Sequence, residues 1–409
     1  MKRLLPAGLL ACLITAPAAQ AQSTLELYGL VDLAVDVTRV NGSGSIAGTY
    51  VRETSGIVYG SRLGLRGSEA LGADWRASFV LEAGILADTG VSGQGGRLFG
   101  RQAVLALDSK ALGLKLGREY SPMAWLVAST TVEAFGVSDL QATIVGINDL
   151  SLRQDNQVTG RASLGPVSLN ASWSPNAGVS PAGVGRTLGA SAPPAGVLPV
   201  TIPPSSTEGG DPRERGQSYG TSLVYAPAPG WYLAAAWNRN DFGVPIYWGA
   251  TSTGVADKID SWLVAGRMPI FKGTLTAQWW EQRLSYASGP LAGTTPTYRI
   301  AALGAKYPVL DNLELVGQVA YYKDSNLTGG SDTAFNLGAT YLLSRRTGVY
   351  FRYIYFSDEA GTPTLGGRIS GGPVITAFNL GLATVPALGA GLLPGQSSYL
   401  AGVGVYHRF

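Results

Sequence analysis

The sequence predicts an all-β fold: a closed antiparallel β-barrel of sixteen strands that crosses a membrane. Three observations predict it. Apolar and polar residues alternate at period two over long stretches. The connections between these stretches are short and long in turn, and the 409-residue chain contains 56 glycines but no mature apolar segment of helix-spanning length. Together they fit a barrel whose outer face meets lipid and whose inner face meets water.

Residues 1–21 have the pattern of a cleaved export signal. A basic start is followed by an apolar core at 9–16 and a small-x-small cleavage site at 19–21. An N-terminal membrane anchor is the first alternative, but the apolar run is short and Pro17 interrupts it. A lipoprotein signal ending at Cys12 is the second, although the preceding residues match that signal poorly. We therefore expect cleavage after residue 21.

The mature chain, 22–409, is predicted to be a single barrel domain of 388 residues, which is 409 less 21. Cleavage removes the only cysteine, which excludes disulfides and thiolate catalysis. It also removes two of 30 basic residues and leaves 28 against 27 acidic ones, a balance that argues against nucleic-acid binding. Because the sequence has no metal-ligand cluster, P-loop or dinucleotide fingerprint, we expect no cofactor and no enzymatic activity.

The stretch 25–37 shows the strand pattern most clearly. Leucine and valine alternate there with Glu26, Tyr28, Asp32 and Asp36. Thirteen residues at about 3.3 Å each reach about 43 Å, enough to cross a bilayer at a tilt, whereas soluble strands average roughly five or six residues. Residues 313–322 and 335–343 repeat the pattern. The apolar face is therefore expected to meet lipid and the polar face a water-filled lumen.

Connections of two lengths alternate along the chain and give the strand number. Seven are short and eight are long, hence sixteen strands, with short turns at the periplasmic rim and long loops outside. The short ones are 71–74, 109–112, 165–166, 226–230, 271–273, 307–312 and 344–348. The long ones are 39–55, 88–98, 121–152, 175–216, 241–258, 288–297, 324–333 and 358–397.

Aromatic residues cluster near the expected strand ends, at 231–237, 279–280 and 350–356. Such clusters are typical of the aromatic girdles at membrane interfaces. The alternative is the aromatic core of a soluble β-sandwich or propeller. Neither of those folds explains the alternating loop lengths.

Several stretches in order resemble the general porins of Gram-negative bacteria, especially the β-proteobacterial branch. The matches cover the first third of the chain and its last residues, while the middle matches only by strand pattern. Leu63, Ala70 and the composition of 175–216 depart from the family and bear on which solutes pass. The matching stretches are Leu27-Tyr28-Gly29, 61–69, 81–84 with 88–90, 98–103, 116–122 and 406–409.

The resemblance implies that the third long loop, 121–152, folds into the barrel and narrows it. Its acids would then face a basic wall across the pore, with the expected residues Glu133, Asp139 and Asp149 on the loop and Arg62, Arg66, Arg101 and Arg153 on the wall. Parity places Arg62 and Arg66 in the lumen, because Leu63 and Leu65 take the lipid face. Arg101 shares its phase with Ala103 and Leu105, so it faces inward only if a bulge shifts the register. For each charge, a solvated rim position is the alternative.

The same resemblance implies an outer-membrane porin that passes ions and small hydrophilic solutes passively. It further implies a homotrimer, contacts with outer-membrane lipid and lipopolysaccharide, and an assembly signal at Arg408 and Phe409 for the barrel-assembly machinery. A substrate-preferring porin and an outer-membrane barrel enzyme are the alternatives. The single histidine, His407, lies in the last strand and makes a histidine-based hydrolase improbable.

Overall fold

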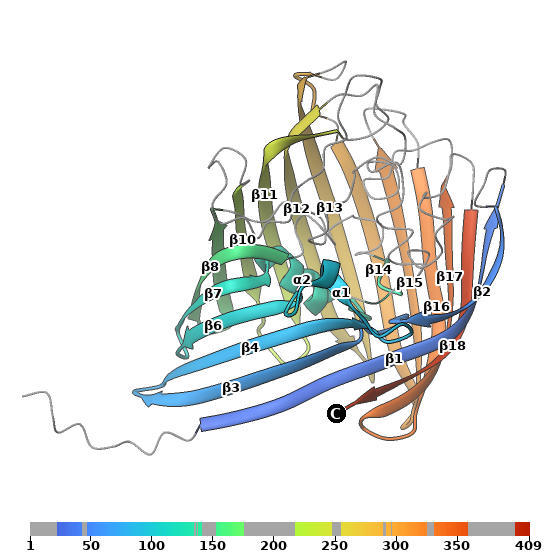
Figure 1. The fold of residues 1–409 in the computed structure, drawn as a ribbon, viewed down its shortest axis with the longest axis horizontal. Coiled ribbons are helices and arrows are strands. Elements are labelled where there is room, and N and C mark those ends of the chain that lie inside the picture. The colour runs from blue at the N-terminus through green and yellow to red at the C-terminus, as the bar shows by residue number, and fades with distance from the viewer. Residues whose placement is uncertain are drawn as a thin grey trace, which may run out of the picture.

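The computed structural model describes residues 23–42, 47–134, 136, 138–140, 153–175, 217–247, 255–288, 292–295, 297–324, 331–358 and 397–409. The expected signal, residues 1–21, and nearly all of the loops 175–216 and 358–397 lie outside this part. The described chain forms one antiparallel sheet that closes on itself as a barrel (Figure 1).

The sheet contains eighteen strand segments and is accompanied by two short helices. No helix in the described ranges is long and apolar enough to span a membrane. The strands are β1 Ser23–Asn41, β2 Gly48–Ser55, β3 Arg62–Gly72, β4 Trp75–Leu86, β5 Val91–Ser92, β6 Gln102–Asp108, β7 Leu112–Tyr120, β8 Arg153–Leu164, β9 Val167–Ser174, β10 Gln217–Tyr225, β11 Tyr232–Tyr247, β12 Val255–Ile270, β13 Gly273–Ser288, β14 Thr297–Leu310, β15 Leu313–Asp324, β16 Ser331–Leu342, β17 Thr347–Asp358 and β18 Ser397–Arg408; the helices are α1 Gly93–Gly96 and α2 Pro122–Thr130.

These segments make sixteen wall strands, which confirms the predicted number. β2 and β3 both pair with β1 and form one wall strand that is interrupted at 56–61. β5 is a two-residue segment beside β4 and adds no wall strand. The barrel closes where β1 pairs with β18 from Leu30↔Arg408 to Asn41↔Ser397.

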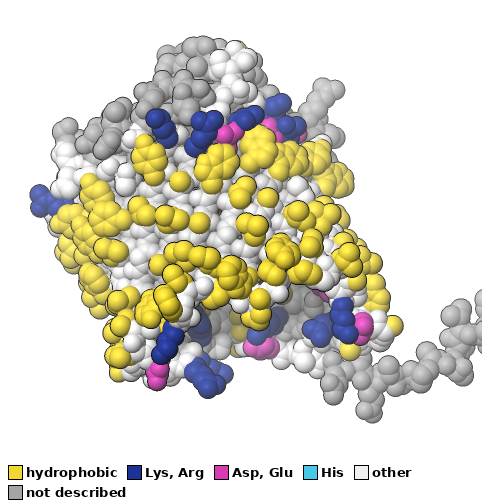
Figure 2. Space-filling model, turned by 180° about the vertical axis from the view of Figure 1, so that it is seen from behind, with side chains coloured by type: hydrophobic (Ala, Val, Ile, Leu, Met, Phe, Trp, Pro, Cys, Tyr) yellow, Lys and Arg dark blue, Asp and Glu magenta, His cyan; other side chains and the backbone are white. Residues whose placement is uncertain are grey.

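Alternating burial along β1 confirms the two-faced strand. Leu25 and Leu27 on the outer face are 74% and 60% exposed, whereas Asp32 and Asp36 on the inner face are fully buried. The other strands follow the same rule. The outward apolar side chains form the hydrophobic belt in Figure 2.

Two expected loops are shorter than the sequence suggested. The range 39–55 is mostly strand, because β2 pairs with β1 up to Val40↔Gly48. Asp36 ties these strands together: Arg52 Nη2 donates to its Oδ2 at 2.8 Å, and Thr54 donates to its Oδ1. The range 241–258 was likewise too long, since β11 continues to Tyr247 and β12 begins at Val255.

The interruption at 56–61 is organised by Asp32. Its Oδ2 accepts hydrogen bonds from the backbone N–H of Val58 at 3.0 Å and of Tyr59 at 2.7 Å. Gly56 begins the break with a φ of +82°, a conformation that glycine adopts without steric cost. The segment is thereby fixed against the inner wall, where it meets the tip of the inward-folded loop.

Candidate pore constriction

The chain that follows β7 folds into the barrel and begins with helix α2 (Figure 1). Pro122 stands at the first helical position, and the Ser121 hydroxyl caps the helix by accepting from Ala124 N at 3.1 Å, an arrangement that favours a helix start. On β13, Gln278 Nε2 donates to Thr130 Oγ1 at 2.8 Å and to Val127 O at 3.4 Å. The helix is thus bonded to the inner wall.

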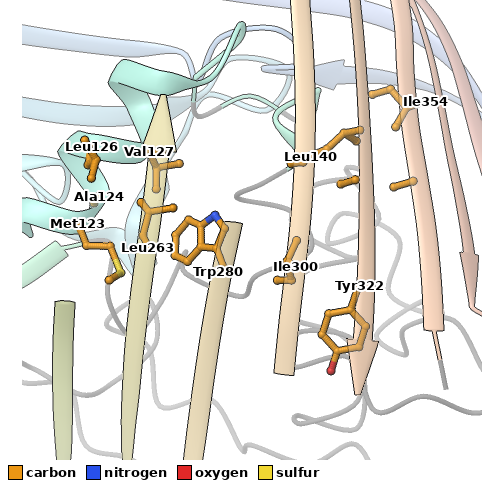
Figure 3. Close-up of a cluster of buried hydrophobic side chains, with 14 of the residues drawn as sticks. Met123, Ala124, Leu126, Val127, Leu140, Leu263, Trp280, Ile300, Tyr322 and Ile354 are labelled. Atoms are coloured by element: carbon orange, nitrogen blue, oxygen red, sulfur yellow. The ribbon is translucent and has the colours of Figure 1, made fainter. Parts of the chain in front are cut away.

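One side of α2 is buried against that wall. Met123, Leu126 and Val127 are at most 2% exposed and belong to one apolar cluster with Leu263 and Trp280 (Figure 3). Burying such side chains contributes roughly 1.5–3 kcal/mol each. This apolar packing, inside a barrel that was expected to be water-filled, holds the loop off the pore axis.

The other side of α2 presents Trp125 to the lumen. This ring is 41% exposed, and Lys115 Nζ lies 5.5 Å from its centroid. Lys115 also donates to Glu119 Oε2 at 3.0 Å. A cation therefore sits next to an open aromatic face at the edge of the channel.

The loop acid Glu133 is paired with the wall behind the loop rather than with the expected arginines. Arg352 Nε on β17 donates to both Glu133 carboxylate oxygens at 3.1 Å, and Asn336 Nδ2 donates to Oε2 at 3.2 Å. The two ion-paired side chains are 4% and 2% exposed. Because Arg352 neutralises Glu133 out of reach of solvent, this acid adds little field to the pore.

Backbone contacts fix the remainder of the loop tip. Ser138 N donates to Ile57 O at 2.9 Å, and Leu140 N donates to Gln318 Oε1 at 3.3 Å. Asp139 is fully buried in this packing, so it also does not stand opposite the arginines. Asp149 lies outside the described residues.

Across the lumen, two of the expected arginines share one carboxylate. Arg101 Nε donates to Glu82 Oε1 at 2.6 Å, and Arg62 Nε lies 3.6 Å from Oε2. Tyr28 donates its hydroxyl to the same Oε2 at 3.0 Å. Glu82 therefore gathers Arg62 and Arg101 at one height on the wall formed by β3, β4 and β6.

Arg101 reaches this position through an irregularity at the start of β6. Gln102 is the ladder partner of Glu82, yet Arg101 N also donates to Glu82 O at 3.1 Å. Two residues thus lie opposite one, which is the geometry of a β-bulge. This is the phase change that an inward Arg101 required.

Arg153, at the start of β8, completes the basic group. Its Nη2 donates to the Tyr120 hydroxyl at 2.8 Å, and its guanidinium lies 4.5 Å from the Tyr120 ring centroid. Arg62 and Arg101 also interact electrostatically with Tyr120. The structure thus brings Arg62, Arg101 and Arg153 together around a single tyrosine.

Arg66 and the carboxyl end lie elsewhere. Arg66 forms a bidentate pair with Glu26 at 2.8 Å, and both side chains are 54% exposed. It faces the lumen one turn of the pattern closer to the short turns than Arg62. Arg408 stacks on Tyr59 and Tyr406, while Phe409 exchanges backbone hydrogen bonds with Gly29 at 3.0 and 3.1 Å and closes the seam.

A cavity of about 740 Å³ lies beside this wall and opens toward the short-turn end. Its lining includes Tyr28, Arg62, Glu82, Arg101, Lys115 and Trp125. At the narrowest level, Arg62, Arg101, Arg153 and Lys115 face two carboxylates, Glu82 and Glu119. The wall therefore carries an excess of two positive charges.

Sequence reasoning missed Glu82, Glu119, Lys115 and Arg352. Parity places each of them on an inward face, so this signal was available. Their pairing was not, because Arg352 lies 219 residues from Glu133 in the chain. Within the described residues, no group of His, Cys, Asp or Glu has an arrangement that could hold a metal ion.

Comparison with known proteins agrees with this architecture. A family model described as Gram-negative porin matches residues 8–361. An outer membrane porin protein of Bordetella pertussis is 38% identical over 170 residues, covering 38% of this chain and 43% of the relative. Outer membrane porin protein 32 of Delftia acidovorans is 33% identical over 156 residues, 37% of this chain and 43% of the relative. The matched segments thus span less than half of each relative.

Solved structures match almost the whole chain. The anion-selective porin from Comamonas acidovorans superposes with a TM-score of 0.68 at 18% identity, covering 95% of this chain and all of the other. The trimer form of OmpT from Vibrio cholerae gives 0.61 at 14% identity, covering 95% and 99%. At these identities the likeness shows the fold alone. With the family match over most of its length, the chain belongs to the Gram-negative porins, proteins of the bacterial outer membrane.

Proposed function

We propose that this chain forms a water-filled channel through the outer membrane, along which ions and small hydrophilic solutes diffuse passively, with a weak preference for anions. The observation that carries the proposal is the uneven charge at the constriction. Arg62, Arg101 and Arg153 line one wall, whereas the loop acid Glu133 is buried against Arg352. The positive wall is therefore not opposed by an equal negative one.

The strength of this preference follows from Coulomb's law. One unit charge about 8 Å from a passing ion contributes roughly 0.5–2 kcal/mol for a dielectric constant between 80 and 20. A small excess of positive charge therefore biases ion flux several-fold to about thirty-fold. Salt screening weakens the bias, because the Debye length is about 10 Å at 0.1 M.

Several features of the family are proposed for this chain with less direct support. A homotrimer agrees with the trimeric form described for the structurally similar OmpT. Cleavage after residue 21 agrees with the strand that starts at Ser23. Arg408 and Phe409 are proposed to signal to the barrel-assembly machinery, and lipid and lipopolysaccharide to surround the barrel.

A preference for organic anions is a second candidate. It is favoured by the open Trp125 ring beside Lys115 at the channel edge, since an aromatic face and an ammonium group together suit a carboxylate with an apolar body. The test is transport of benzoate relative to acetate into liposomes. A benzoate advantage that disappears in Trp125→Ala supports this candidate, and equal ratios in both proteins contradict it.

Single-channel recording in a planar bilayer tests the proposed function itself. Purified protein should insert and give ohmic conductance steps, grouped in threes if the trimer forms. A barrel that inserts, as judged by resistance to protease, but conducts no ions would refute the open channel.

A further inference from the structure

Five neighbouring strands carry a continuous row of charged side chains on the outer face of the barrel. The strand register places Arg239 opposite Asp260, Asp260 opposite Arg283, Glu281 opposite Arg299, and Arg299 opposite Lys323. Five strands at about 4.8 Å spacing give a row about 19 Å wide. We call it the outer charge row; it consists of Arg239, Asp260, Glu281, Arg283, Arg299 and Lys323.

Alternation shows that the row faces outward. The neighbours of its members along the strands, such as Asn240, Ser261 and Trp280, are at most 1% exposed and face inward. Charged side chains on the outside of a membrane barrel are costly at the bilayer midplane and are tolerated near its interfaces. Their height on the barrel therefore decides what they contact.

Each strand places this row just beyond the aromatic girdle. On β12 the outward residues toward the long loops are Val264, Trp262 and then Asp260, and on β15 they are Val319, Tyr321 and then Lys323. β11 and β13 have the same order of apolar, aromatic and charged residues. Aromatic girdles mark the lipid interface. The row therefore lies at the headgroup level on the side of the long, external loops, where Figure 2 shows charged side chains above the hydrophobic belt.

Within the row, the acids are covered and the arginines are presented. Arg239 holds Asp260 through two hydrogen bonds of 2.8 and 2.9 Å, and Arg283 and Arg299 both hold Glu281. The carboxylates are 10% exposed, whereas the three arginines are 38–52% exposed. Four basic side chains against two acidic ones leave a net positive surface.

Aromatic rings beneath the row help to orient these cations. Arg283 lies 4.9 Å from the Trp262 ring centroid, and Arg239 lies 5.7 Å from that of Trp237. Guanidinium groups fixed in this way match phosphate oxygens bidentately. An apolar belt directly below them suits acyl chains.

From this arrangement we infer that the outer charge row binds the phosphorylated headgroup of lipopolysaccharide in the outer leaflet, with arginine–phosphate contacts. The inference rests on the proposed function only in that the barrel spans the outer membrane. Because the acids are already paired with arginines, the contact is direct and needs no bridging divalent cation.

The test uses the full-length barrel and deep-rough lipopolysaccharide, which consists of lipid A and inner-core sugars, in phosphatidylethanolamine nanodiscs. The triple variant Arg239→Gln, Arg283→Gln, Arg299→Gln should bind it at least about tenfold more weakly, since single hydrogen bonds to charged groups already contribute roughly tenfold. The matched control Lys110→Gln, Lys272→Gln, Arg345→Gln removes three exposed charges from the short turns and should leave binding unchanged. Both variants should conduct like the parent, so failure of the channel and failure of the site are distinguishable.

A second variant tests the site without removing any arginine. Glu281→Gln takes away the acid that holds Arg283 and Arg299, so it should tighten lipopolysaccharide binding several-fold. Three outcomes would overturn the inference: equal affinity of the triple variant and the parent, loss of binding in EDTA, and dissociation of the oligomer without loss of lipopolysaccharide. The last would instead identify the row as a contact between protein subunits.

Discussion

The ion pair between Glu133 and Arg352 makes the most specific prediction about the inward loop. The variant Glu133→Gln keeps the size of the side chain but removes the charge that Arg352 holds, and both residues are almost completely buried. Removing one partner of a buried pair typically costs about 3–5 kcal/mol, because an uncompensated charge remains. We expect the loop tip to leave its wall contacts for part of the time.

Single-channel recording measures this loss. Glu133→Gln should show larger and noisier open-channel currents, because a detached tip changes the width of the constriction. The matched control is Glu26→Gln, which breaks the Arg66 pair in which both side chains are 54% exposed. Exposed pairs are worth about 0–1 kcal/mol, so the control should conduct quietly.

A double variant separates charge from shape. Adding Arg352→Met to Glu133→Gln removes the uncompensated cation, so the current should become quieter than in Glu133→Gln alone. Equal noise in Glu133→Gln and Glu26→Gln would refute the reasoning that the buried pair anchors the loop.

Three further predictions concern single positions. Arg101→Gln removes one wall charge and should move the reversal potential toward cations several-fold more than Arg66→Gln, measured in a tenfold salt gradient. Gly136→Ala places a Cβ 2.3 Å from Val58 O, so it should displace the loop tip and raise current noise as Glu133→Gln does; quiet currents would contradict the close approach. Deleting Phe409 removes both hydrogen bonds that close the seam and should lower the yield of heat-modifiable barrel on electrophoresis, whereas an unchanged yield would show that the terminal residue is dispensable.

Period-two alternation and loop lengths were sufficient to predict the barrel, because both follow directly from having lipid outside and water inside. The face assignment of Asp32 and Asp36 was correct for the same reason. The loop predicted at 39–55 was too long, since its strand pairing depends on the cross-strand contact of Asp36 with Arg52. Local sequence carries no signal for such a contact.

The constriction could be predicted only in part. Parity placed Arg62 inward, but the position of Arg101 depends on a bulge that alternation does not reveal. Glu133 was expected to face the arginines, and its burial depends on Arg352, which the chain brings close only through closure of the barrel. The sign of the pore charge therefore needed the three-dimensional pairing.

The central claim is that the basic wall outweighs the loop acids. It is tested most directly by the reversal potential of the parent channel in a planar bilayer with a tenfold potassium chloride gradient. A shift toward the chloride equilibrium potential, which weakens in high salt, is the result expected. A shift toward the potassium potential would contradict the account, because it would mean that acids rather than Arg62, Arg101 and Arg153 dominate the pore.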